Sequence, residues 1–347
     1  MKNKAFIING KIKCMESCRV VKGYYLVIGG GKIGTDFLRY ARKNGFPFVL
    51  VIDRDENAPA SGEAKILKTE NELADLLRNK SLPALPENEP EISGAEENKQ
   101  KKAGKSEKEN KDNNNESEAY FYKMDMHDIP SLFAYGIPEY IIPAVPCHAV
   151  AYILADFLKF FNPEFCTGGV QKQESSVKEL FIRPEDSLLI SYFEDIATAF
   201  PEDVIAGRYP EYGMLFLSYA REGEICPDGC PGPRDRCPTF GRKKPETITE
   251  YTGKLKDKLP GWVFESHQMK PGTGGLKGEE LKQNLLEITE LVRKIGLNQE
   301  NSNENNHKDK SRTEDDGRNE ADKLKERAFF IATTCTCHGV LNLFYVT

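Results

Sequence analysis

Three cysteines lie close together in one segment, and each is followed by proline: Cys226, Cys230 and Cys237. Their spacing differs from the C-x-x-C pair that is typical of zinc ribbons. Proline stiffens the chain after each cysteine, and Gly229 and Gly232 allow it to bend closely, as a loop around a metal must. Because thiolates favour zinc and iron–sulfur clusters, the segment predicts a site for one of these.

A further ligand has to come from elsewhere, and the candidates lie near the C-terminus. Cys335, Cys337 and His338 follow a strand-like run at residues 329–331. If that strand continues, the two sulfurs point to one face, because a single residue separates them. The alternative is that these cysteines are free thiols, or form a disulfide in an oxidising compartment.

A glycine-rich turn stands where a nucleotide could bind. Residues 24–29 form a short apolar run, which is typical of a strand buried on both faces of a parallel sheet. A second run at residues 48–52 ends at Asp53, and an apolar stripe at helical spacing separates the two. This is the context that the dinucleotide fingerprint G-x-G-x-x-G requires. The six residues that match it are Gly29, Gly30, Gly31, Lys32, Ile33 and Gly34.

The residue types of this turn suit a dinucleotide. Gly29 permits the tight turn, Gly31 lets the backbone approach a pyrophosphate, and Gly34 lets helix and strand pack closely. The helix N-terminus offers N–H groups and partial positive charge to the phosphates. Asp53 would accept hydrogen bonds from a ribose and repel a 2′-phosphate, which favours NAD over NADP, although the neighbouring Arg54 weakens that preference. S-adenosylmethionine and FAD are alternatives, as is a glycine turn that only packs.

The strand and helix pattern continues beyond a polar interruption, with strands expected at 119–125 and 140–145 and helices at 129–135 and 147–160. The arrangement resembles the nucleotide-binding domain of the TrkA-N (RCK-type) family, which regulates potassium transporters and channels. More loosely, it is similar to saccharopine dehydrogenase-like reductases. The resemblance covers residues 22–165 and implies a Rossmann-type fold that binds NAD(H). It depends on the fingerprint at 29–34, Asp53, a strand ending at Asp125, Leu132, Gly136-Ile137 and the strand at 140–145.

Two pairs of residues follow strands at the edge where open parallel sheets bind their ligands. Cys147 and His148 come after the strand at 140–145 and are the candidate catalytic pair. A cysteine near a helix N-terminus can have a lowered pKa, and a histidine can move a proton. The alternative is a buried cysteine beside a polar residue that starts a helix. His127 and Asp128, after the strand at 119–125, are placed similarly, and the alternative for them, which is favoured, is that they only cap the next helix.

A second glycine-rich loop, at residues 271–278, lies between an expected strand at 262–268 and an amphipathic helix at 279–294. Strand, glycine loop and helix suggest an anion site at the helix start. The loop lacks the G-K-[ST] ending of a P-loop, so ATP hydrolysis is not supported. His267 can point toward the loop, or the segment is only a flexible connection.

The formal net charge of −6 over 347 residues is concentrated in two polar segments. Residues 87–118 and residues 298–322 each contribute −4, which leaves +2 for the rest of the chain. Both segments are nearly free of apolar residues and are expected to be disordered. A remainder so close to neutral argues against nucleic-acid binding.

The overall expectation is an α/β protein with two domains. Residues 1–21 form an N-terminal extension, residues 22–165 a Rossmann-type parallel-sheet domain with a disordered insertion at about 80–118, and residues 166–347 a Cys-rich α/β domain with a metal-binding loop. No apolar run is long enough to span a bilayer, and no signal peptide is evident. Nine cysteines are too few for a secreted disulfide scaffold, which predicts a cytoplasmic location.

The leading functional hypothesis is a cytoplasmic NAD-dependent oxidoreductase of unknown substrate, with an iron–sulfur cluster or zinc in its second domain. Its reaction cleft would be lined by Cys147, His148 and the metal loop. The alternative is a non-catalytic NAD(H) sensor that regulates a protein partner, such as a potassium transporter, and uses zinc only for stability. The expected partners are a dinucleotide and either a small-molecule substrate or a protein; a homo-oligomer is compatible with both hypotheses.

Overall fold

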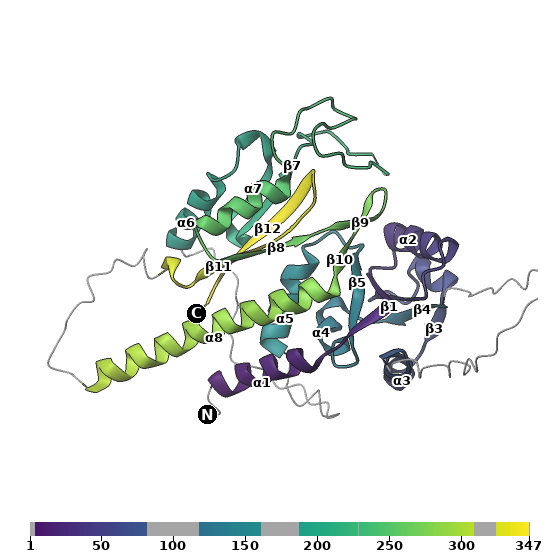
Figure 1. Cartoon of the computed structure of the whole chain (residues 1–347), viewed down its shortest axis with the longest axis horizontal. Coiled ribbons are helices and arrows are strands. Elements are labelled where there is room, and N and C mark those ends of the chain that lie inside the picture. Colours follow the sequence, from purple (N-terminus) through teal and green to yellow (C-terminus); the bar gives the residue numbers. More distant parts are fainter. Residues whose placement is uncertain (1–3, 82–117, 161–186, 228, 309–323, 347) are drawn as a thin grey trace, which may run out of the picture.

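The computed structural model describes residues 4–81, 118–160, 187–227, 229–308 and 324–346, shown in colour in Figure 1. These residues form two β-sheets and the helices that cover them. The α/β class expected from the sequence is confirmed. The helices are α1 (Lys4–Ser17), α2 (Lys32–Lys43), α3 (Glu70–Ser81), α4 (Ile129–Leu132), α5 (Ala149–Phe160), α6 (Ser187–Ala197), α7 (Ile248–Lys254) and α8 (Gly278–Lys308).

The first sheet has seven strands in the order β3-β4-β2-β1-β5-β10-β9. The five strands from β3 to β5 are parallel, whereas β10 runs antiparallel to β5 and β9 antiparallel to β10. Strands β1 and β2 are buried on both faces, as their apolar runs predict. The bounds are β1 (Val20–Ile28), β2 (Phe48–Asp53), β3 (Lys65–Leu67), β4 (Glu118–Lys123), β5 (Ile137–Pro143), β9 (His267–Lys270) and β10 (Thr273–Lys277).

The second sheet has five strands in the order β6-β7-β12-β11-β8. Only β8 and β11 are parallel; the other neighbours are antiparallel. Helices α6 and α7 pack on one face through a core that contains Phe193, Leu215 and Phe330. The bounds are β6 (Ile205–Tyr209), β7 (Met214–Ser218), β8 (Gly261–Glu265), β11 (Ala328–Thr334) and β12 (His338–Tyr345).

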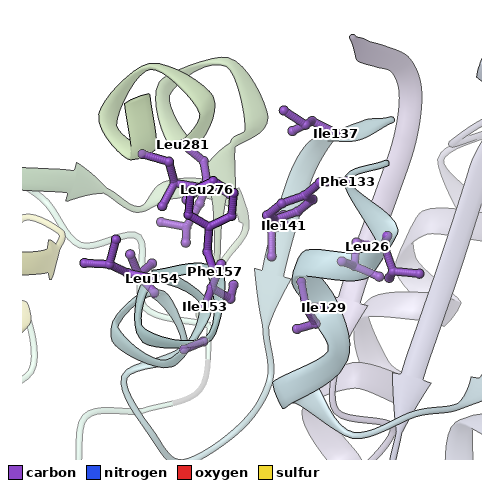
Figure 2. Close-up of a cluster of buried hydrophobic side chains, with 14 of the residues drawn as sticks. Leu26, Ile129, Phe133, Ile137, Ile141, Ile153, Leu154, Phe157, Leu276 and Leu281 are labelled. Carbon is purple, nitrogen blue, oxygen red and sulfur yellow. The ribbon is translucent and has the colours of Figure 1, made fainter. Parts of the chain in front are cut away.

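Helices α5 and α8 lie between the two sheets. A single core joins one face of the first sheet, both helices and the near face of the second sheet, where Phe329 and Phe344 stack. Figure 2 shows part of this core, with Leu276 of β10 and Ile141 of β5 beside Phe157 of α5. Each fully buried side chain of this kind stabilises the fold by roughly 1.5–3 kcal/mol relative to an exposed one. The opposite face of the first sheet packs against α2.

The two halves of the chain therefore do not form one sheet each. Strands β9 and β10, from the part expected to form the second domain, complete the first sheet. Helix α1, from the expected N-terminal extension, packs in the same core through Met15. The Lys282 ammonium of α8 donates to the Cys18 carbonyl at 2.8 Å. The expected boundary at 165/166 lies outside the described residues.

Several local expectations need correction. The sequence predicts a loop at 271–278, but β10 occupies most of this segment. Gly278, directly after β10, allows close packing, because a Cβ there would collide with the backbone oxygen of Pro138. Residues 298–308, expected to be disordered, continue α8. Residues 82–117 and 309–322 of the expected insertions lie outside the described residues. Ile33 does not join the buried stripe of α2, because it is 53% exposed.

None of the helices in the described ranges combines the length and the apolar character that a membrane span requires.

His148, a predicted catalytic residue, connects α5 to the second sheet. Its side chain is buried, and Nδ1 lies 2.6 Å from Asn342 Oδ1. Because an amide oxygen only accepts, Nδ1 carries the proton, and Nε2 accepts from the Thr333 hydroxyl at 3.0 Å. Burial lowers the pKa of His148 to about 4. The neutral imidazole is thus a structural link between α5, β11 and β12.

This link predicts a loss of stability in acid. Between an unfolded-state pKa of about 6.5 and the folded value of about 4, only the unfolded chain binds a proton at His148, so the free energy of unfolding falls by about 3 kcal/mol as pH drops through this window. His148→Gln should flatten that pH dependence, even if it lowers stability at pH 7 through the lost hydrogen bonds. Urea unfolding of both proteins at several pH values measures it; identical slopes for wild type and variant would contradict the assignment.

Candidate functional site

A cavity of about 490 Å³, here called the sheet-edge pocket, lies at the carboxyl ends of the parallel strands. The strand order reverses at this point, because β2 lies on one side of β1 and β5 on the other. Ligands of open α/β sheets bind at such a switch point. Its lining includes Gly29 and Gly31 after β1, Asp53 and Arg54 after β2, Asp125 and His127 after β4, and Cys147 after β5.

The glycines of the turn after β1 have different roles. Gly29 has φ +100°, and a Cβ there would lie 2.7 Å from the Ala144 carbonyl oxygen. A Cβ at Gly34 would collide with the Gly29 carbonyl oxygen, so this glycine lets α2 approach β1. Gly31 stands at the start of α2 and lines the pocket, with no atom within 4 Å of the position of a Cβ. Gly29 and Gly34 thus shape the turn, while Gly31 leaves space at the pocket.

The Asp53 carboxylate is held in place at the end of β2. The Gly30 N–H donates to Oδ2 at 2.6 Å and the Asp55 N–H to Oδ1 at 2.9 Å. A carboxylate oxygen can accept more than one hydrogen bond, so both oxygens can still accept from a ligand in the pocket. Of the other predicted cofactor residues, Lys32 and Ile33 begin α2 on its exposed side and do not line the pocket.

Only one member of the predicted catalytic pair reaches the sheet-edge pocket. Cys147 lines it, but burial raises the pKa of this thiol, whereas a reactive cysteine needs a lowered value. The Cys147 S–H points to the Met126 thioether, at 3.7 Å. His148 points away, into its contacts with the second sheet.

His127 takes the place expected of His148. It lines the pocket, and its Nδ1 lies 2.7 Å from Oδ2 of Asp156, a buried residue of α5. Asp128 stands at the N-cap position of α4 but its side chain makes no capping hydrogen bond; the Asp125 side chain instead caps the short 3₁₀ turn Met126–Asp128 by accepting from the His127 backbone N–H. From the sequence, Asp156 was not singled out as a site residue. The pattern that could have indicated it is an acidic residue on the otherwise apolar side of an amphipathic helix.

A second cavity of about 410 Å³, here called the thiol pocket, lies where the two sheets meet. It is bounded by the loop after β7, the turn between β11 and β12, and the link from β8 to β9. Five of the predicted metal ligands line it, namely Cys226, Cys230, Cys335, Cys337 and His338, and so does His267. Cys237 is buried outside this lining.

The turn between β11 and β12 differs from the prediction for this segment. Strand β11 ends at Thr334, and the Cys335 N–H donates to the His338 carbonyl at 2.8 Å, which closes a hairpin. The two sulfurs therefore do not project from one strand face. Both still line the same pocket as Cys226 and Cys230. Burial first, and then the Cys230 and Cys337 thiols, raise the pKa of Cys226 to about 11.

The side chains in the thiol pocket do not stand at metal-binding spacing. In the ranges that the structure describes, no group of three or more Cys, His, Asp or Glu side chains is placed to hold a metal ion. The seven described cysteines from Cys18 onward are free thiols. His267 lies 3.3 Å from the Glu280 carboxylate, so it faces the start of α8 as well as the pocket. A metal here therefore stays a proposal.

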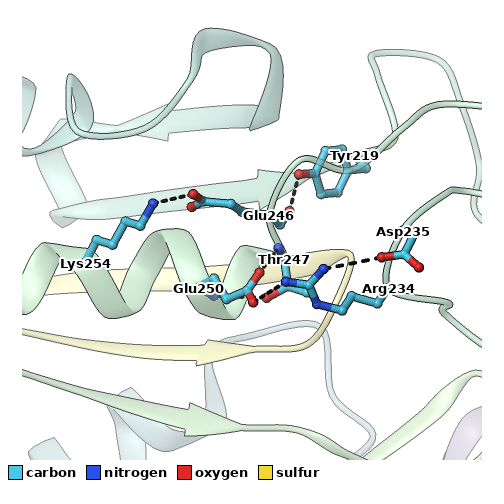
Figure 3. Close-up of polar contacts among 7 residues, drawn as sticks. All are labelled: Tyr219, Arg234, Asp235, Glu246, Thr247, Glu250 and Lys254. Atoms are coloured by element: carbon cyan, nitrogen blue, oxygen red, sulfur yellow. Dashed lines mark hydrogen bonds and ion pairs between the residues drawn. The ribbon is translucent and has the colours of Figure 1, made fainter.

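Two of the five basic residues beside the cysteine loop, Arg234 and Arg242, are paired with acids, and the other three, Arg236, Lys243 and Lys244, have no acidic partner among the described residues. Figure 3 shows Arg234 between Asp235 and Glu250, and the guanidinium to Glu250 distance is 2.6 Å. Glu250 also completes a capping box with Thr247 at the start of α7. Arg242 pairs with Glu224. Arg234 and Arg242 are therefore part of a structural network of ion pairs.

Comparison with known proteins gives two similarities. Residues 178–347 match a family model described as "Uncharacterized protein, C-terminal domain". An "Uncharacterized protein" of Archaeoglobus fulgidus is 25% identical over 320 residues, which cover 91% of this chain and 97% of that protein. No solved structure matches. The archaeal relative therefore spans both parts of the chain, and the family model covers the part with the cysteine loop and the turn between β11 and β12.

The different roles of the glycines predict a contrast between two matched substitutions. Gly31→Ala places a methyl group in open space, so its cost is limited to the weaker capping by alanine at the start of α2, about 0.5–1 kcal/mol. Gly34→Ala forces α2 away from β1 and should cost about 1–3 kcal/mol. Urea unfolding of both variants measures the difference. Equal losses, or a larger loss for Gly31→Ala, would contradict the assigned roles.

Proposed function

We propose that the sheet-edge pocket belongs to a Rossmann-type domain and binds NAD, and that the protein is an NAD-dependent oxidoreductase. One observation supports this above all. The glycine turn, the N-terminus of α2 and the Asp53 carboxylate meet at one cavity, at the point where the parallel strand order reverses. These are the three parts that a Rossmann-type site needs for the pyrophosphate and the ribose.

The residues present fit the dinucleotide. A cavity of about 490 Å³ is in the usual range for cofactor pockets. Open space beside Gly31 allows a pyrophosphate close to the backbone at the start of α2. Asp53 would accept hydrogen bonds from the adenosine ribose hydroxyls, and its charge disfavours the 2′-phosphate of NADP. Arg54 lines the same pocket, so discrimination against NADP should be incomplete.

His127 is the candidate proton donor or acceptor of the reaction. Bound NAD supplies a hydride acceptor, or in its reduced form a donor. An alcohol or carbonyl substrate would in addition lose or gain a proton, and a histidine at the mouth of the pocket can move it. The buried Asp156 carboxylate, 2.7 Å from Nδ1, orients the ring. Cys147, a neutral thiol, would help shape the pocket.

A non-catalytic NAD(H) sensor is the second candidate, and one observation favours it. The two residues that the sequence singles out for catalysis offer neither a thiolate nor a free imidazole, because Cys147 has a raised pKa and both ring nitrogens of His148 are hydrogen-bonded. A sensor would bind NADH without oxidising it. Hydride transfer between NAD(H) and a panel of small alcohols and carbonyl compounds, abolished by His127→Ala and retained by the exposed control Lys123→Ala, would select the enzyme. Binding without turnover of any of these compounds would select the sensor.

Nucleotide preference tests the role of Asp53. Asp53→Asn keeps an oxygen that can accept from Gly30 but removes the charge, so we expect NAD affinity to fall roughly tenfold and the preference over NADP to vanish. Asp36→Asn, on the exposed surface of α2 outside the pocket, is the control and should leave both affinities unchanged. Isothermal titration calorimetry of the full chain measures them. Absence of NAD binding to the wild type would rule out the proposal.

A further inference from the structure

The loop after β7 directs one backbone hydrogen-bond donor at each of two of its sulfurs. The Gly232 N–H donates to Cys230 Sγ and the Phe240 N–H to Cys237 Sγ, each at 3.4 Å. Backbone donors aimed at sulfur stabilise negative charge there, and it is the thiolate form of cysteine that binds metals. The loop is therefore arranged for charged sulfurs, which an ordinary buried thiol does not need.

A buried lysine adds positive charge at the same place. Lys244 is 4% exposed, and its ammonium donates to Cys337 Sγ at 2.7 Å and to the Pro233 carbonyl at 2.5 Å. The ring of Tyr219 lies 5.9 Å away. None of the ion pairs found among the described residues gives Lys244 a carboxylate partner. A buried ammonium is costly without a compensating anion, and a cluster of thiolates is the anion that the surroundings can supply.

Four of the cysteines are neighbours of one another. Cys226, Cys230 and Cys337 line the thiol pocket together, and the Cys237 thiol is also close enough to Cys226 to raise its pKa. Gly232, which follows Cys230 by two residues, has φ +58°, and its Cβ position is 3.9 Å from Cys337 Sγ. The fifth cysteine near the thiol pocket, Cys335, has a different neighbour. Its Sγ lies 3.9 Å from Nδ1 of His338 within the hairpin turn.

We infer that Cys226, Cys230, Cys237 and Cys337 form a four-thiolate centre for a thiophilic metal, zinc or an iron–sulfur cluster, with Lys244 as its buried counter-charge. Four thiolates around zinc, or around a cluster, leave a net negative charge, which the ammonium offsets. The centre needs rotation of the cysteine side chains toward the thiol pocket, since in the described ranges they are not at metal-binding spacing. The inference does not depend on NAD binding.

The first test is the metal content of the full chain after anaerobic purification, with X-ray absorption at the bound metal. We expect a stoichiometric amount of zinc or iron, and a shell of sulfur neighbours, at about 2.3 Å for zinc. Iron with broad visible absorption identifies a cluster, and zinc in a colourless protein identifies a mononuclear site. A metal-free protein that also fails to take up zinc or to accept cluster reconstitution would overturn the inference, as would a ligand shell dominated by nitrogen or oxygen.

Two matched pairs of variants test the ligand set and the counter-charge. Cys337→Ser should lose at least tenfold in metal affinity, and Cys335→Ser, two residues away on the same pocket, should keep the metal. Lys244→Met should release metal to a chelator about tenfold faster than the exposed control Lys243→Met. Metal loss in Cys335→Ser, or equal release from both lysine variants, would overturn the assignment. An unchanged circular dichroism spectrum of each variant separates loss of the centre from loss of the fold.

Discussion

The pairing of β10 with β5 joins the two halves of the chain. Leu276 pairs with Ile141 and Lys277 with Tyr140 in antiparallel register, so β10 begins near the carboxyl end of β5. Gly278 makes the close approach possible, because any Cβ there would meet the backbone of β5. The beginning of β10 also lines the thiol pocket. The sheet-edge pocket, lined by the segment after β5, and the thiol pocket, lined by the beginning of β10, therefore lie along the same edge of the first sheet, at neighbouring strands.

The helices between the sheets hold this arrangement in place. Helix α8 continues directly from β10, and α5 follows the strand end that carries Cys147. Both contribute to the core shared by the two sheets, and His148 adds a polar link from α5 to the second sheet. Asp156 extends from the same helix to His127. Helix α5 thus positions the residues of the candidate active site and fixes them relative to the second sheet.

The unit from β1 to β2 could be predicted from sequence because its signals are local: apolar runs buried on both faces, a glycine turn and a helical stripe. Strand β10 could not, since Thr-Gly-Gly has little strand propensity and pairs only because β5 is adjacent.

The role of His148 depends on Asn342, 194 residues away in sequence. The hairpin at Cys335 was missed because Cys-Thr-Cys has none of the residues that favour turns. The sequence predicted that the loop cysteines and the C-terminal cysteines come together, as they do in the thiol pocket. Their exact spacing could not be predicted, because it depends on how the two sheets pack, which no local sequence pattern specifies.

A crystal structure of the full chain with NAD⁺ tests the central claim most directly. We expect the pyrophosphate at the N-terminus of α2, beside Gly31, and the adenosine ribose hydroxyls within hydrogen-bond distance of the Asp53 carboxylate. The nicotinamide should then lie toward His127 and Cys147. A dinucleotide bound elsewhere, or a sheet-edge pocket that stays empty at saturating NAD⁺, would contradict the account.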